Sequence, residues 1–409
     1  MTFTKNPRSL MVHLKESLIG KSGLIFCIIF GILAFSGTSK IPNFALMGAY
    51  QLPNFPDITT GMSILRIWTI VEKFEYSHFG ELYFSNNFVY GLFAGYLIYL
   101  ICNRAIKNNN FSKLLLVLPG LLIAIFFSAS PGPIFDITFA VSLVVSLLYL
   151  LDIGEQISPT QVFKLSFWVT LMYMSRPFGM YFAFVIYGYF FFKVGKRILP
   201  AIAVTVLVMA PFHIIQLNNF DTFTLSTYSG TNLVEALASS GENPNQFLDC
   251  KEILGRENYD TKEMVDCSNI NKSRATHLYV TKPTVFLGLF SPKRVVKTFM
   301  FANPFWPGTG INPHPKNLHL IIVSIIYYVS LFFTYLIFIL NFSKNRFYIF
   351  PLAFFSMGLI FPLLGTDGSE AIRIFMPFIA VTYLTVTNKQ PNQSLDTRAL
   401  NQSDSAHTS

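Results

Sequence analysis

The sequence predicts an all-α polytopic membrane protein with about nine or ten transmembrane helices and one large extracytoplasmic loop. The chain is 52% hydrophobic and 12% charged, with 44 Phe among 409 residues, a composition that suits lipid-facing surfaces. Its apolar runs approach the roughly 20 residues that a helix needs to cross a bilayer core. Because lipid offers no partner for backbone polar groups, we expect these runs to be helices.

The predicted spans fall in an amino-terminal block, residues 1–215, and a carboxy-terminal block, residues 319–387. The amino-terminal block includes a first extracytoplasmic loop at 37–87. Basic residues beside the spans put both chain termini in the cytoplasm by the positive-inside rule. The predicted spans are 24–35, 88–101, 114–128, 134–151, 163–192 (as two helices), 198–215, 320–340, 350–364 and 372–386.

The run 163–192 is too long for one ordinary helix and is interrupted by Arg176 and Pro177. Proline biases the residue before it away from helix, so we expect two short helices that meet outside at this break. The second helix would end inside at Lys193, Lys196 and Arg197. The direction of every later span depends on this division.

The segment 216–318 is predicted to be the large extracytoplasmic region, and the polar tail 388–409 to be disordered in the cytoplasm. The outer compartment is oxidising, so Cys250 and Cys267 are expected to form a disulfide rather than a zinc site. Cys27 and Cys102 belong to spans, where a thiol behaves as a small buried hydrophobe.

Residues 283–299 (PTVFLGLFSPKRVVKTF) combine apolar anchors with cations that include Lys293 and Arg294. Such a segment suits the membrane surface beside lipid phosphates. A loop helix packed on the transmembrane part is an equally good interpretation, and the sequence leaves both open.

The net charge of +9 does not indicate nucleic-acid binding, because the basic residues form short clusters beside apolar runs. Charged residues at helix mouths are functional candidates, since such positions are costly for charge. On the predicted outer face these are Asp57, Arg176, Glu370 and Arg373. Arginine grips phosphate and a carboxylate accepts a proton, which suits a phosphate-bearing ligand attacked by a hydroxyl. Taken singly, Arg373 could pair with Glu370, and Asp57 could cap a helix.

Several short segments resemble the GT-C-type membrane glycosyltransferases, in the protein-mannosyltransferase-like branch that uses polyprenyl-phosphate sugars. The segment 369–377 (SEAIRIFMP) is similar to the family's entry into its last span, and 227–233 (TYSGTNL) to the start of its outer loop. Asp57, in 54–57 (NFPD), corresponds to an acidic residue of the first loop, although Ile58 stands where the family often has Glu. The Tyr-rich segment behind that acid is absent.

The resemblance implies a GT-C-like fold and transfer of a sugar from a polyprenyl-phosphate donor to a lipid, glycan or protein acceptor outside. Asp57 would deprotonate the acceptor hydroxyl or bind a divalent cation that does so; the fallback carboxylates are Glu72, Glu75 and Glu81. Arg176 and Arg373, with Glu370, would hold the leaving phosphate. Lys293 and Arg294 would grip the carrier lipid. The metal requirement stays open, and the expected location is the bacterial inner membrane.

Three other classes remain open. An envelope polysaccharide polymerase of the O-antigen type would share the lipid-linked substrate. A transporter or flippase is disfavoured because the chain shows no clear internal repeat and almost no mid-span charge, His213 being the nearest exception. A scaffold without catalysis is the third.

Overall fold

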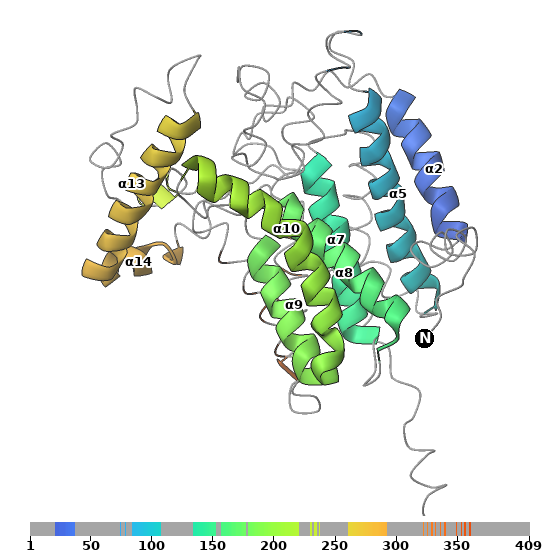
Figure 1. Cartoon of the computed structure of the whole chain (residues 1–409). Helices are drawn as coiled ribbons and strands as arrows, with labels where there is room; N and C mark the ends of the chain where they lie inside the picture. The colour runs from blue at the N-terminus through green and yellow to red at the C-terminus, as the bar shows by residue number, and fades with distance from the viewer. Residues whose placement is uncertain are drawn as a thin grey trace, which may run out of the picture.

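The computed structural model describes residues 21–36, 84–107, 134–152, 157–176, 179–220 and 261–292. It also describes isolated helical residues at 74, 78, 230, 233, 234, 237, 322, 325, 329, 332, 336, 339, 340, 349, 353, 356 and 360. Within these residues the structure is helical and contains no strand. Figure 1 shows a bundle formed by α2, α5, α7, α8, α9 and α10, with α13 and α14 beside it. The all-α class is therefore confirmed for the described part of the chain.

The bundle helices vary in length from 16 to 24 residues. Their bounds are α2 Lys21–Ser36, α5 Phe84–Lys107, α7 Ile134–Asp152, α8 Pro159–Ser175, α9 Gly179–Val194 and α10 Leu199–Phe220, with a short 3-10 turn, η4 Gly195–Ile198, before α10. The predicted runs 24–35, 88–101, 134–151, 163–192 and 198–215 coincide with these helices but are short at the ends. The predicted runs 114–128 and 372–386 lie outside the described residues, as does the tail 388–409. Polar residues continue α5 in both directions, and α10 runs on to Phe220 past the predicted boundary at 215.

The start of α8 follows from local chemistry. The Ser158 hydroxyl accepts the backbone N–H of Gln161, and the Gln161 side chain accepts the backbone N–H of Ser158. This capping box satisfies two N–H groups that a helix start leaves without partners, and Pro159 suits the first helical position.

Helices α8 and α9 are separated at Arg176, as the sequence predicted. Arg176 has extended backbone angles (φ −143°, ψ 146°), and its carbonyl accepts the backbone N–H of Gly179 at 2.8 Å. A Cβ at Gly179 would lie 2.2 Å from the carbonyl oxygen of Met172. Only glycine allows the two helices to approach this closely, so the corner has a fixed shape.

The chain turns again at Gly195, whose φ of 64° favours glycine. In a continuous helix, residues 187 and 201 would lie about 21 Å apart, because each residue rises roughly 1.5 Å. Instead the Tyr187 hydroxyl donates to the Ala201 carbonyl at 3.2 Å. Helices α9 and α10 therefore form a hairpin, which Figure 1 shows.

Among the described residues, one helical run is long and apolar enough to cross a membrane, Gly179–Ile214, and it includes the Gly195 turn. Shorter apolar helices occur at Gly23–Leu33, Asn87–Asn103 and Ile137–Leu150. The core of the bundle is formed by α5, α7, α8 and α9, with fully buried Tyr90, Phe139, Phe182 and Phe190.

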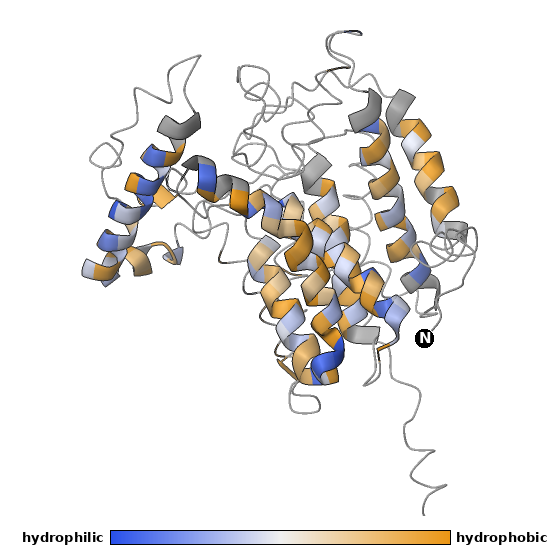
Figure 2. Cartoon of the chain, viewed as in Figure 1, coloured by the Kyte–Doolittle hydropathy of each residue, from blue (hydrophilic) through white to orange (hydrophobic). Residues whose placement is uncertain are grey.

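The outer faces of the bundle are also apolar, as the orange ribbons of Figure 2 show. Phe184 is 68% exposed, Phe192 74% and Leu207 72%. On α2, the exposed apolar side chains are Leu24, Ile25, Ile28, Ile29, Ile32 and Leu33. Helical residues spaced three or four apart from Ile322 to Leu340 expose apolar side chains as well.

The outlying part consists of α13 Thr261–Thr281 and α14 Pro283–Gly288. Gly230 packs on α13: its backbone N–H donates to the Ser268 hydroxyl at 2.9 Å, and a Cβ there would lie 1.8 Å from the Ser268 carbonyl oxygen. Val234, Leu237, Ala275 and Val285 form a small core of their own. Segments on both sides of residues 238–260 thus fold together.

Candidate functional site

The bundle has two ends that differ in chemistry. Phe139 in α7 packs edge-on against Phe182 in α9, with ring centroids 5.7 Å apart. Near the other end of both helices, the Tyr189 hydroxyl donates to the Leu150 carbonyl at 2.8 Å. Helices α7 and α9 are therefore parallel, and α8 and α10 run opposite to them. We call the end with the α8–α9 corner the Arg176 end, and the other the Gly195 end.

Arg176 is the central feature of its end. Its side chain is only 4% exposed, although the surrounding helices are apolar. Burying a guanidinium costs several kcal/mol unless anionic or other accepting groups surround it. The corner held by Gly179 thus presents a cation in a place where an anion would be strongly stabilised.

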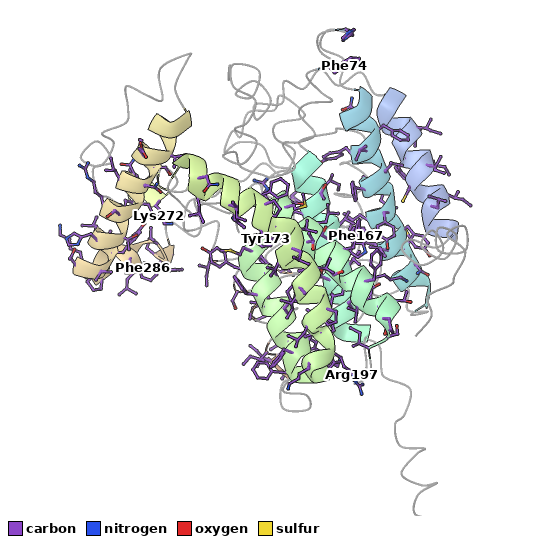
Figure 3. All side chains as sticks on the ribbon, viewed as in Figure 1. Phe74, Phe167, Tyr173, Arg197, Lys272 and Phe286 are labelled. Carbon is purple, nitrogen blue, oxygen red and sulfur yellow. The ribbon has the colours of Figure 1, made fainter. Side chains whose placement is uncertain are left out.

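Tyr173 and His213 lie beside this corner. Tyr173 lies in the last turn of α8, three residues before Arg176, which follows the end of the helix. The Tyr173 hydroxyl and His213 Nε2 are 2.9 Å apart, and the hydroxyl donates when Nε2 carries no proton. Tyr173 is labelled in Figure 3, where α8 and α10 meet. We call Tyr173, Arg176 and His213 the corner cluster.

Pro211 helps bring His213 to this position. It lies inside α10, where it removes the hydrogen bond to the Leu207 carbonyl four residues earlier. Such a proline bends a helix, and Figure 1 shows α10 changing direction along its length. The bend carries the end of α10 sideways toward α13, which it contacts.

A chain of hydroxyls ties α8, α9 and α10 together below the corner cluster. Thr170 and Thr205 Oγ1 atoms are 2.7 Å apart, and Thr205 is also hydrogen-bonded to Tyr187. Since Tyr187 donates to Ala201, Thr205 donates to Tyr187 and Thr170 donates to Thr205. Buried hydroxyls with these bonds fix how the three helices sit against one another.

Asp136 belongs to the same end of the bundle. It occupies the first turn of α7, three residues before Phe139, and Phe139 packs near the start of α9. The start of α9 follows the Arg176 corner directly. A carboxylate position and a buried cation therefore share one end, which the sequence alone did not indicate for Asp136.

The Gly195 end has exposed cations instead. Lys196 and Arg197 are exposed, and Lys193 is half-buried, with its amine 3.0 Å from the Tyr189 hydroxyl and above the Tyr189 ring. Figure 3 shows Arg197 at the tip of the bundle. These solvated cations flank apolar helices, as positively charged flanks do on the cytoplasmic side of membrane proteins.

Among the residues predicted to form the site, Arg176 is the one whose surroundings are described. Outside the described residues lie Asp57, Glu72, Glu75, Glu81, Cys250, Lys293, Arg294, Glu370 and Arg373. Where the structure describes the chain, it contains no group of three or more His, Cys, Asp and Glu that could hold a metal ion.

Cys267 is buried in α13 and is disulfide-bonded, whereas Cys27 and Cys102 are free thiols. Its expected partner, Cys250, is not among the described residues, so the Cys250–Cys267 pairing stays a prediction. Asn271, the acceptor of the sequon 271–273, is fully buried and donates to the Cys267 sulfur. A glycan at Asn271 is therefore incompatible with this packing.

Sequence reasoning missed Tyr173, and it named His213 only as the nearest exception to the scarcity of mid-span charge. The structure joins the two by a hydrogen bond. One signal was available: Thr170 and Tyr173 are three residues apart in a largely apolar run just before Arg176, which puts both polar side chains on one side of a helix. Comparisons of the chain with protein-family models, curated proteins and solved structures found no match.

Proposed function

We propose that the chain is a polytopic membrane glycosyltransferase that moves a sugar from a polyprenyl-phosphate donor to an acceptor on the extracytoplasmic face. The observation that carries the proposal is the buried Arg176 at the α8–α9 corner, at the same end of the bundle as the Tyr173–His213 pair and the position of Asp136. A phosphate anion is the ligand that such a cation favours.

The outward faces of α2, α9 and α10 are apolar, and exposing so much apolar surface to water would be unfavourable. These faces therefore support a position inside a membrane. The exposed Lys196 and Arg197 favour a cytoplasmic Gly195 end. The Arg176 end would then face the outer compartment, where a lipid-linked donor presents its sugar. Both chain termini would be cytoplasmic, in a bacterial inner membrane.

In the proposed reaction, a carboxylate removes the proton of the acceptor hydroxyl as its oxygen attacks the anomeric carbon. The bond from that carbon to the phosphate oxygen breaks, and polyprenyl phosphate leaves with the electron pair. Arg176 stabilises the charge that develops on the phosphate, and Tyr173 donates a hydrogen bond to it when His213 Nε2 carries a proton and donates to the Tyr173 oxygen. Asp57 and Asp136 are the two candidates for the base.

The test is release of polyprenyl phosphate from a panel of labelled polyprenyl-phosphate sugars by purified protein in nanodiscs, with candidate acceptors added. We expect release by wild type and loss in either Asp57→Asn or Asp136→Asn. The variant that keeps activity identifies the carboxylate that is not the base. No release from any donor by folded protein, with lipid or solute movement across proteoliposomes instead, would replace the proposal with a transporter.

A further inference from the structure

Helix α14 buries apolar side chains on one side and exposes them on another. Val285 is 8% exposed and packs into the small core with Ala275 and Val234, and Leu289 beyond the helix is fully buried. Leu287 is 65% exposed and Phe286 39%, and Thr284 is the one exposed polar side chain of the helix. Large apolar side chains that gather on an exposed surface often mark a contact with a membrane or another protein.

The exposed apolar surface continues onto the end of α13. Val280 there is 74% exposed, and Phe286 packs edge-on against the Tyr279 ring, with centroids 5.6 Å apart. In Figure 2 the α14 ribbon is orange, whereas the upper part of α13 carries many hydrophilic positions. The apolar surface is thus confined to the α13–α14 tip, which we define as Val280, Phe286 and Leu287.

The charge of the surrounding sequence is one-sided. No Asp or Glu occurs between Asp266 and Asp367. From Asp266 to Lys297, the Lys and Arg residues are Lys272, Arg274, Lys282, Lys293, Arg294 and Lys297. On the described part, Lys272 and Lys282 are exposed. An apolar tip with this charge matches a partner that is apolar inside and anionic at its surface.

We propose that the α13–α14 tip is a membrane-surface anchor, with Val280, Phe286 and Leu287 inserted among the headgroups of an anionic phospholipid bilayer and the cations around them on lipid phosphates. An amphipathic segment of this kind buries its apolar side at the headgroup boundary. Helix α10 of the bundle contacts α13, so the proposed anchor is attached to the bundle through α13. The inference requires the bundle to be in a membrane, but it does not depend on sugar transfer.

The experiment places a nitroxide label at Leu287→Cys, Val280→Cys or Ser273→Cys, in full-length protein that lacks Cys27 and Cys102 and keeps Cys250 and Cys267. Ser273 is the matched control, because it is exposed on α13 seven residues before Val280, about 10 Å along the helix axis. The protein is reconstituted in nanodiscs with anionic phospholipid. Collision rates with oxygen, which enters lipid, and with a water-soluble nickel chelate are measured.

We expect labels at 287 and 280 to collide with oxygen and not with nickel, and the label at 273 to collide with nickel. Access of nickel to all three positions would mean that the tip is in water. Exclusion of both reagents at 287 would mean that protein covers it. Either result overturns the proposal.

A second arm tests the charge of the lipid. In nanodiscs of zwitterionic lipid, or with Lys282→Glu in anionic lipid, we expect nickel access at 287 to rise. Each basic residue near an anionic surface contributes about 1 kcal/mol, which corresponds to roughly a fivefold change in occupancy. Equal protection in both lipids would overturn the role of the cations.

Discussion

Helix α9 joins two corners that use similar residues in opposite ways. Each corner has a glycine and basic side chains. At the first, Gly179 is required by close approach to Met172, and the basic residue, Arg176, is buried. At the second, Gly195 is required by its φ of 64°, has open space around it, and the following cations are exposed.

Both corners carry positive charge, so burial distinguishes the cation proposed to bind phosphate from the cations proposed to set the orientation of the bundle in the membrane. An exposed Lys or Arg keeps its hydration and interacts weakly with any single anion. A buried guanidinium is screened less by water, so its interaction with a nearby anion is stronger than that of an exposed cation. The first corner is therefore the candidate site, and the exposed cations of the second corner are the proposed mark of the cytoplasmic side.

The largest expected difference between the corners is in activity. Arg176→Gln should lower the rate of polyprenyl phosphate release by about 100-fold, as loss of a charge-stabilising donor does in other enzymes. Arg197→Gln at the second corner should leave the rate unchanged. The assay is single-turnover release in nanodiscs, with thermal melting as a check on folding. If Arg176→Gln and Arg197→Gln lowered the release rate equally, the two corners would not differ in function as proposed.

The next difference concerns the glycines. Gly179→Ala would place a methyl group 2.2 Å from the Met172 carbonyl oxygen and should lower the free energy of unfolding by about 3 kcal/mol. Gly195→Ala should lower it by about 1 kcal/mol, through the positive φ alone. Gly188→Ala is the control, since nothing lies within 4 Å of the added Cβ.

These stabilities are measured by denaturant titration in detergent micelles. Equal destabilisation by Gly179→Ala and Gly188→Ala would show that α8 and α9 do not approach each other as closely as described.

The hydroxyl chain beneath the first corner gives a smaller effect. Thr205→Val removes hydrogen bonds to Thr170 and Tyr187 and should cost about 1–2 kcal/mol of unfolding free energy. Thr205→Ser keeps the hydroxyl and should recover most of the loss. If valine were no more destabilising than serine, the hydrogen bonds of Thr205 would contribute no more than the methyl contact that serine lacks.

The smallest effect is expected at the second corner. Tyr189→Phe removes the donor to the Leu150 carbonyl and the acceptor for the Lys193 amine, near the tip of the bundle. Tyr189 is buried, but the half-buried Lys193 amine can turn to water, so we expect a loss of about 1 kcal/mol, from the Leu150 hydrogen bond alone. A loss larger than that of Thr205→Val would mean that this corner is as tightly packed as the first.

The sequence predicted the features that depend on local patterns. Helix positions follow from apolar runs, and the break at Arg176 follows from Pro177. The bend of α10 at Pro211 was not predicted, although Pro211 is a local signal for it. The packing of α14 was not predicted, because it depends on α13 and on residues 234–237. Arg176 was selected for its place at a helix mouth, whereas its burial and the Tyr173–His213 hydrogen bond at the same end of the bundle depend on segments far apart in the chain.

The most direct test of the account is the sidedness of the two ends of the bundle. Single cysteines would be placed at Lys196, exposed at the second corner, and at Ser273, exposed on α13. The background would be the full chain without Cys27 and Cys102, expressed in bacterial cells. A membrane-impermeant maleimide should label Ser273→Cys in intact cells and Lys196→Cys only after permeabilisation. Labelling of Lys196→Cys in intact cells, or of neither before permeabilisation, would contradict an outward-facing Arg176 end.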